Sequence, residues 1–298
     1  MTATTTTVPV PDGPDRVDVA LRTLTVDGVE LNVATAGAGP AVLLLHGFPH
    51  TWQLWSRVIG ELARRHRVIA PDLRGFGDSA RPAGGYDAGT LAADAEGLLA
   101  ALGETSAAVV GIDVGAPPAF LLAMRRPDLV RRLVLMESLL GTLPGAEDFL
   151  AGGPPWWFGF HAEPGLAESV LVGHEKRYVE WFLDRGTLGR GVGDDDVRDR
   201  IVRTYTGSEA LRGAFGPYRA LAETGRQIAA ALDRGRLTVP TLTIGAHPVG
   251  RALERQLTSY ADDLTGHVIP DCGHIIPLDR PAALLALLGP HLAGEHEV

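Results

Sequence analysis

Short apolar runs alternate with longer helical patterns through the first half of the chain, and this alternation restricts the fold more than any other feature. In the helical segments the apolar residues recur at spacings of four and three, as Leu91, Ala95 and Leu98 do. Repeated strand-helix-strand units predict a mostly parallel sheet flanked by helices, the α/β class of fold. We expect strands at residues 22–27, 30–36, 41–46, 67–71, 107–112 and 132–136, and helices at 52–65, 91–102 and 116–126.

The alternation stops after Glu137. Residues 138–237 have a helical and aromatic pattern, with the run PPWWFGF at residues 154–160, and a strand pattern returns only at 241–245. We therefore expect an α/β core made of residues 17–137 and 238–298, with a helical cap at residues 138–237 inserted into it. A last strand (267–269) and a last helix (281–292) complete this core. Residues 1–16 have no apolar periodicity and are predicted to be a flexible N-terminal tail.

The composition limits the partners. The 298 residues are 45% hydrophobic, enough to bury a large core, and the formal net charge of −9 disfavours nucleic acid and anionic membranes. No segment approaches the roughly 20 apolar residues that span a bilayer, and the start lacks the pattern of a secretory signal, so we expect a cytoplasmic protein. The single cysteine, Cys272, excludes an internal disulfide and a thiolate metal cluster. A neutral small molecule fits best as a partner, and a homodimer is left open.

The segment VVGIDVGAP, residues 109–117, places Asp113 between two glycines at the junction of a predicted strand and a predicted helix. Gly111 and Gly115 leave room for a tight turn that holds the central side chain above the sheet on a strained backbone. The G-x-S-x-G motif of serine hydrolases has this shape, with serine at the centre. Because G-x-D-x-G also occurs where an aspartate only caps a helix, the surrounding motifs decide its meaning.

Three further motifs accompany this turn along the chain. HGFPHTW (46–52) and PDLRGFGDS (71–79) precede the turn, each at the end of a predicted strand, and CGHIIP (272–277) follows the last strand. With the turn at Asp113, they resemble the α/β-hydrolase superfamily from about residue 20 onward, and within it the epoxide hydrolase branch, which is related to fluoroacetate and haloalkane dehalogenases. The resemblance implies an α/β-hydrolase fold, a mostly parallel sheet flanked by helices, with an inserted helical cap.

The resemblance also implies catalytic roles. Asp113 would be the nucleophile, and His274, on the loop after the last strand, the general base. An acid must orient this base, and many relatives supply it after the strand that here ends in TIGAHPVG, yet residues 246–250 contain no carboxylate. Other relatives use a position that here falls on Glu137, 24 residues after Asp113. Glu137 is therefore the predicted acid, and Asp271 is the alternative.

An aspartate nucleophile changes the chemistry. Its carboxylate is ionised at neutral pH and can attack a tetrahedral carbon that bears a leaving group, which yields an alkyl ester of Asp113. His274 then activates a water that hydrolyses the ester, and the backbone N–H groups of Phe48 and Val114 are expected to form the oxyanion hole. Asp72 and residues 75–78 are interpreted as turn-forming. The sequence therefore predicts an epoxide hydrolase that forms a vicinal diol with no metal or organic cofactor.

The cap is expected to donate hydrogen bonds to the leaving group, as it does in the family. The matching residues are Trp156 and Trp157 in PPWWFGF and Tyr218 in GPYRA. An indole N–H can donate a hydrogen bond but keeps its proton, whereas a phenol can also release it, so Tyr218 is the predicted proton donor. The sequence does not exclude Tyr178, Tyr205 or His161 in these roles. The predicted substrate pocket consists of Phe48, Trp156, Trp157, Phe160, Tyr218 and Ile275.

Two other functions remain alternatives. A hydrolytic dehalogenase would use the same nucleophile, but fluoroacetate dehalogenases carry arginines just after it and haloalkane dehalogenases usually carry a tryptophan, where this chain has Val114 and Pro117. A non-catalytic ligand-binding protein is the second alternative, because a fold does not determine function. The aromatic residues favour a bulky or aromatic epoxide, while the natural substrate and the regio- and stereoselectivity stay open.

Overall fold

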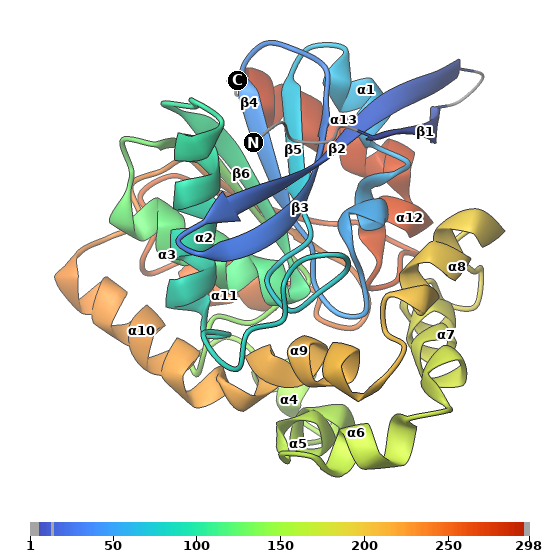
Figure 1. The fold of residues 1–298 in the computed structure, drawn as a ribbon. Helices are drawn as coiled ribbons and strands as arrows, with labels where there is room; N and C mark the ends of the chain where they lie inside the picture. The colour runs from blue at the N-terminus through green and yellow to red at the C-terminus, as the bar shows by residue number, and fades with distance from the viewer. Residues whose placement is uncertain (1–5, 13–14, 295–298) are drawn as a thin grey trace.

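A nine-stranded sheet forms the centre of the computed structural model, which describes residues 6–12 and 15–294 (Figure 1). Its order is β1-β2-β3-β5-β4-β6-β7-β8-β9, antiparallel from β1 to β5 and parallel from β5 to β9. The predicted α/β class is confirmed. The strands are β1 (Thr6–Asp12), β2 (Asp15–Val26), β3 (Val29–Ala36), β4 (Ala41–Leu45), β5 (Arg67–Pro71), β6 (Ala107–Ile112), β7 (Val130–Met136), β8 (Thr241–Gly245) and β9 (Leu264–Val268).

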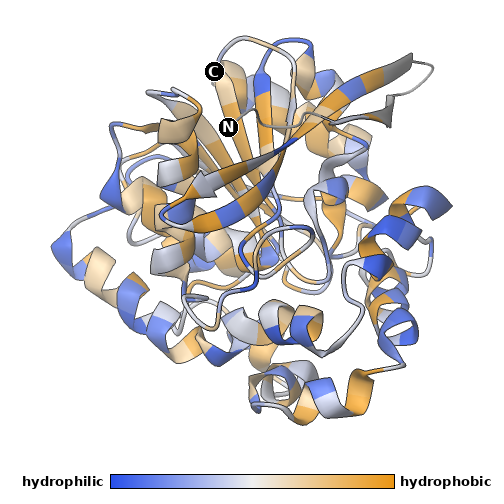
Figure 2. Ribbon diagram, in the orientation of Figure 1, coloured by the Kyte–Doolittle hydropathy of each residue, from blue (hydrophilic) through white to orange (hydrophobic). Residues whose placement is uncertain are grey.

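Helices cover both faces of this sheet. They are α1 (Ile59–Ala63), α2 (Ala88–Ala101), α3 (Ala116–Arg125), α11 (Ala252–Leu257), α12 (Ile276–Asp279) and α13 (Pro281–Ala293). Figure 1 shows α2 and α3 on one face and α1 and α13 on the other. Every residue of β4 and β6 is buried, as expected of parallel strands covered on both sides, and the central strands are accordingly hydrophobic in Figure 2.

Between β7 and β8 the chain forms helices and no strand. Figure 1 shows these helices as a layer beyond one end of the sheet, and the outward-facing parts of α7, α8 and α10 carry hydrophilic residues in Figure 2. We call them the helical layer. Its members are α4 (Glu147–Leu150), α5 (Trp156–Ala162), α6 (Leu166–Leu171), α7 (Glu175–Gly186), α8 (Asp195–Arg203), α9 (Ser208–Arg219) and α10 (Leu221–Arg234). Within the described residues, no helix is long and apolar enough to cross a membrane.

The N-terminal segment differs from the flexible tail predicted for residues 1–16. Residues 6–12 form β1, which pairs antiparallel with β2 from Thr6 opposite Leu21 to Asp12 opposite Asp15. Hydrogen bonds between the backbones of neighbouring strands stabilise an edge strand even when its side chains show no apolar periodicity. An edge strand also tolerates prolines, because not every backbone N–H there needs a partner. Residues 15–16 begin β2, and residues 1–5 and 13–14 of the predicted tail lie outside the described residues.

Several elements depart from their predicted bounds: β2 begins at Asp15 and not at 22, α2 at Ala88 and not at 91, and β7 at Val130 and not at 132. The helix predicted at 52–65 is interrupted: a 3-10 helix, η1 (Trp52–Trp55), precedes the short α1. The last strand runs over Leu264–Val268 and not over 267–269. None of its residues is buried and two of them are exposed, so the apolar pattern that marks the central strands is weak there.

A buried carboxylate, that of Asp72, joins the loop after β4 to the loop after β5. Its Oδ1 accepts a hydrogen bond from the Trp52 N–H at 2.8 Å. Its Oδ2 accepts from the Asn32 side-chain amide at 2.8 Å and from the Asp78 N–H at 3.0 Å. Three donors would lose their acceptor if this carboxylate were removed, which agrees with the interpretation of Asp72 as a structural residue.

We predict that Asp72→Ala lowers the free energy of unfolding by about 3 kcal/mol, since each buried donor left without an acceptor costs ~1–3 kcal/mol. Urea denaturation followed by fluorescence measures the change. Asp78→Ala is the matched control, because its exposed side chain is removed while its backbone N–H remains. Equal midpoints for the two variants would contradict the structural role of Asp72.

Candidate active site

Asp113 stands at the tip of a sharp turn between β6 and α3. Its φ of 53° lies in the left-handed region, which is costly for a residue other than glycine and persists where the surroundings enforce it. The flanking glycines permit the turn because other backbone segments lie too close to them to leave space for a side chain. A Cβ on Gly111 would overlap the carbonyl oxygen of Gly115, and a Cβ on Gly115 would overlap that of Leu45. The turn therefore requires both glycines and holds Asp113 at the carboxyl end of β6.

His274 lies between two carboxylates. Its Nε2 is 3.3 Å from Asp113 Oδ2, and its Nδ1 is 3.2 Å from Glu137 Oε2. The Glu137 side chain is fully buried, and its other oxygen accepts a hydrogen bond from the Ala246 N–H at 2.6 Å. Asp113, Glu137 and His274 follow β6, β7 and β9, so the parallel strands bring together residues that are far apart in sequence.

Asp271, the alternative acid, does not contact His274. Its carboxylate pairs with Arg280 at 2.6 Å, and its side chain is 77% exposed. It also lies 3.4 Å from Arg190. Of the two carboxylates that the sequence offered as the acid, only Glu137 therefore contacts the His274 ring.

The backbone N–H groups predicted to form an oxyanion hole point at Asp113. The Phe48 N–H donates to Asp113 Oδ1 at 2.8 Å, and the Val114 N–H also bonds to this carboxylate. A Cβ on Gly47 would overlap the Asp113 carboxylate, so the backbone of the loop after β4 passes close to it. Two backbone donors thus bind the same carboxylate, and an oxyanion hole is built from donors of this kind.

Charge coupling keeps these groups ionised. Burial alone would lower the pKa of His274, but the hydrogen bonds and charges of Asp113 and Glu137 outweigh burial and raise its pKa to about 10. Burial alone would raise the pKa of Asp113, but His274 and the N–H groups of Phe48 and Val114 hold it below its usual value. At neutral pH His274 is therefore an imidazolium paired with the ionised carboxylate of Asp113.

A cavity of about 770 Å³ opens above Asp113. The loops at the carboxyl ends of the strands line its floor, and α5, α7, α9 and α10 line its roof. Most of its lining is apolar or aromatic, as in small-molecule sites in general. Four residues of the predicted pocket line it, namely Phe48, Trp157, Tyr218 and Ile275.

Trp156 and Phe160 do not line this cavity, and the prediction for them is corrected. Consecutive residues of a helix are turned by about 100°, so Trp156 and Trp157 of α5 face different directions. Trp156 is 56% exposed. Phe160 is half-buried and packs against Trp156 and Tyr178. A pair of adjacent tryptophans therefore contributes one side chain to the cavity, that of Trp157.

The other candidate donors are engaged elsewhere. The Tyr178 hydroxyl lies 2.6 Å from His161 Nε2, and the Tyr205 hydroxyl donates to the His50 carbonyl at 2.8 Å. His161 stacks on Phe215, and burial lowers its pKa to about 3. Tyr218 differs because its side chain lines the cavity and has no hydrogen-bond partner among the described residues. Burial and the nearby Asp113 charge raise the pKa of Tyr218 well above its usual value.

Three contributors were missed from the sequence. Ser138 donates to the Asp113 carbonyl at 2.8 Å and thereby supports the strained turn. Phe158 and Phe182 line the cavity. Phe158 directly follows Trp157, and the run of aromatic residues in the sequence could have indicated it as a lining residue. Whether its side chain faces the cavity depends on how α5 packs. Among the described residues, no group of three or more His, Cys, Asp or Glu side chains is placed to hold a metal ion.

Comparison with known proteins agrees with this geometry. Residues 40–281 match the family model described as alpha/beta hydrolase fold, and the chain belongs to this family. The chain is 29% identical over 273 residues to a soluble epoxide hydrolase from Corynebacterium sp. (strain C12), covering 86% of this chain and 91% of the relative. It is 30% identical over 224 residues to a fluoroacetate dehalogenase from Burkholderia sp., covering 72% of each.

A solved structure resembles the whole fold. The crystal structure of wild-type Cfl2 from Burkholderia cenocepacia superposes with a TM-score of 0.82 at 32% identity, and the match covers 96% of this chain and all of that one. Fold and family together make this chain a hydrolase of the α/β-hydrolase family, with epoxide hydrolases and a dehalogenase among its relatives.

We predict that Asp113→Asn lowers the pKa of His274 from about 10 by roughly two pH units, because the ring loses one of its two anionic neighbours. At pH 9 the ring would then be protonated in the natural protein and mostly neutral in the variant. NMR titration of the histidine rings, assigned with a His274→Gln variant, measures this. Asp184→Asn is the control, since Asp184 lines the cavity without contacting His274. An unchanged titration in Asp113→Asn would contradict the charge coupling.

Proposed function

We propose that this hydrolase is an epoxide hydrolase, which opens an apolar or aromatic epoxide to a vicinal diol through an alkyl ester of Asp113. One observation carries the proposal: an ionised carboxylate, paired with an imidazolium, lies under a mostly apolar cavity that Tyr218 lines. A carboxylate can attack a tetrahedral carbon without a base, and a phenol can protonate the oxygen that leaves that carbon.

In the first step, Asp113 Oδ2 attacks an oxirane carbon and the carbon–oxygen bond of the ring breaks. Tyr218 donates its proton to the ring oxygen, which remains on the product as a hydroxyl. Its raised pKa keeps the phenol protonated until that oxygen becomes strongly basic. Trp157 donates a hydrogen bond without releasing its proton. Oδ1 becomes the ester carbonyl oxygen and stays against the Phe48 N–H.

Ester formation also prepares the second step. When Asp113 becomes a neutral ester, His274 loses a negative neighbour, its pKa falls, and it releases its proton to the Tyr218 phenolate. The neutral ring, oriented by Glu137, then removes a proton from water, whose oxygen attacks the ester carbonyl. His274 returns this proton to the departing alkoxide of the diol. The Asp113 carboxylic acid finally protonates His274 and restores the starting ion pair.

The helical layer is the proposed cap. We assign residues 138–237 to the cap and residues 17–137 and 238–298 to the core, with the cavity between them. Under this division the core supplies the nucleophile, base and acid, and the cap supplies Tyr218 and Trp157. The cap would also exclude bulk water, which strengthens the electrostatic interactions inside the cavity.

A hydrolytic dehalogenase is the second candidate, and the similarity to a fluoroacetate dehalogenase favours it. The chemistry of the cavity argues against an anionic substrate. Arg185 is the single arginine among the described lining residues, and it is exposed and stacked on Trp181. Next to the nucleophile the lining is formed by Val114 and Pro117. A neutral epoxide fits this lining better than a haloacetate does.

We predict that styrene oxide is converted to its diol, and that repeated turnover in oxygen-18 water places the label in the Asp113 carboxylate. The label enters because water attacks the carbonyl carbon of the ester. Mass spectrometry of the peptide that contains Asp113 measures it, and Asp113→Asn, which should lose turnover, is the control. Diol formed without labelled Asp113 would reject the ester mechanism. Fluoride release from fluoroacetate without any diol would favour the dehalogenase.

We predict that Tyr218→Phe slows ester formation about 100-fold, within the range expected for loss of a general acid. Stopped-flow fluorescence under single-turnover conditions measures the rate. Tyr178→Phe is the matched control, because its hydroxyl bonds to His161 and the residue does not line the cavity. If both variants form the ester at the natural rate, Tyr218 is not the proton donor.

A further inference from the structure

The C-terminal end of α7 touches both sides of the loop that holds His274. The Ile275 N–H donates to the carbonyl oxygen of Gly186 at 2.9 Å. On the other side, a Cβ on Gly273 would overlap the same carbonyl oxygen, so the two backbones pack with no space for a side chain. The residues before and after the proposed base therefore both rest against the proposed cap.

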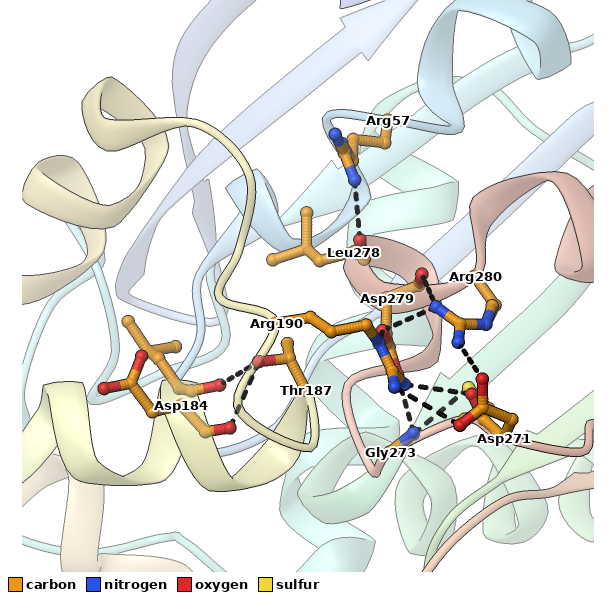
Figure 3. Close-up of polar contacts among 11 residues, drawn as sticks. Arg57, Asp184, Thr187, Arg190, Asp271, Gly273, Leu278, Asp279 and Arg280 are labelled. Atoms are coloured by element: carbon orange, nitrogen blue, oxygen red, sulfur yellow. Dashed lines mark hydrogen bonds and ion pairs between the residues drawn. The ribbon is translucent and has the colours of Figure 1, made fainter.

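Arg190 extends this contact through an ion pair. Its Nε donates to Asp279 Oδ1 at 2.7 Å and its Nη2 to Asp279 Oδ2 at 2.6 Å, as Figure 3 shows. Nη2 also donates to the Asp271 carbonyl at 2.9 Å. Paired hydrogen bonds from a guanidinium to a carboxylate fix the orientation of both groups, which a single contact would not do.

Asp279 connects Arg190 to the histidine loop. Its Oδ2 accepts a hydrogen bond from the N–H of Gly273, the residue before His274, at 2.7 Å. The Asp279 side chain is only 1% exposed, and Arg280 is its other cationic partner at 3.1 Å. Burial alone would raise the pKa of Asp279, but Arg190 and the Gly273 N–H outweigh burial and lower it. A buried carboxylate of this kind depends on its partners, since losing one leaves charge uncompensated.

We propose that Arg190 is a positioning residue for His274: from the cap, through Asp279 and the Gly273 N–H, it holds the base where it can activate the hydrolytic water. Arg190 and Asp279 lie 89 residues apart in the chain and belong to different proposed domains. The position of the cap against the core therefore affects the orientation of His274. This inference rests on the proposed ester mechanism.

The two chemical steps should respond differently to the loss of Arg190. Attack by Asp113 needs no base, because the carboxylate is already ionised. Hydrolysis needs the ring of His274 within hydrogen-bond distance of a water, and a misplacement of about 1 Å can cost a rate ~100-fold. Loss of Arg190 is therefore expected to act on hydrolysis and to leave ester formation nearly unchanged.

The kinetic test compares Arg190→Met with Arg198→Met. Arg198 is the matched control, because it pairs at 3.5 Å with Asp184 inside the cap. With styrene oxide and acid quenching, intact-mass measurement gives the rates of ester formation and decay. In Arg190→Met we expect decay to slow at least about tenfold, formation to stay within about twofold, and ester to accumulate. Arg190→Lys should restore part of the decay rate, because lysine supplies the charge without the paired geometry.

Hydrogen exchange provides a readout that needs no substrate. In Arg190→Met the amides of residues 273–276 should exchange about tenfold faster, and in Arg198→Met they should exchange at the natural rate. Unchanged exchange, or decay of the ester as fast as in the natural protein, would overturn the positioning role while leaving the ester mechanism standing. Absence of any ester in the natural protein would instead reject the proposed function on which this inference rests.

Discussion

The contact of His274 with two carboxylates is the interaction on which the rest of the site depends. A buried imidazole would normally lose its proton, yet the charges of Asp113 and Glu137 raise its pKa to about 10. The imidazolium in turn helps to hold Asp113 ionised at the carboxyl end of β6. The parallel sheet makes this possible because the ends of β6, β7 and β9 meet at one edge. No local segment of the chain could assemble the three groups.

The parts of the fold that could be predicted are those dictated by local chemistry. Parallel strands buried on both faces appear as uninterrupted apolar runs, so β4 and β6 were recognisable. The turn at Asp113 was recognisable because two close backbone approaches tolerate only glycine at Gly111 and Gly115. The strand β1 was missed, since pairing at a sheet edge depends on backbone bonds that leave no apolar pattern.

Other features depend on packing that the sequence does not reveal. Trp156 and Trp157 have the same chemistry, and only the rotation of α5 against the core decides which of them lines the cavity. The choice between Glu137 and Asp271 likewise required distances, because both are carboxylates near a strand end. Arg190 and Asp279 are ordinary charged residues in the sequence, and their pairing appears only when the turn after α7 meets the loop after β9.

These contacts give the proposed cap a second role besides covering the substrate. A cap that only enclosed the cavity could contact the core anywhere along its rim. Here the C-terminal end of α7 instead packs against the residues on either side of His274, and Arg190, just after α7, binds the carboxylate that accepts from the Gly273 N–H. In the proposed mechanism, the ester forms without a base and is released only by an aligned one. A cap seated against the histidine loop would therefore keep the base aligned during the step in which water must attack the enclosed ester.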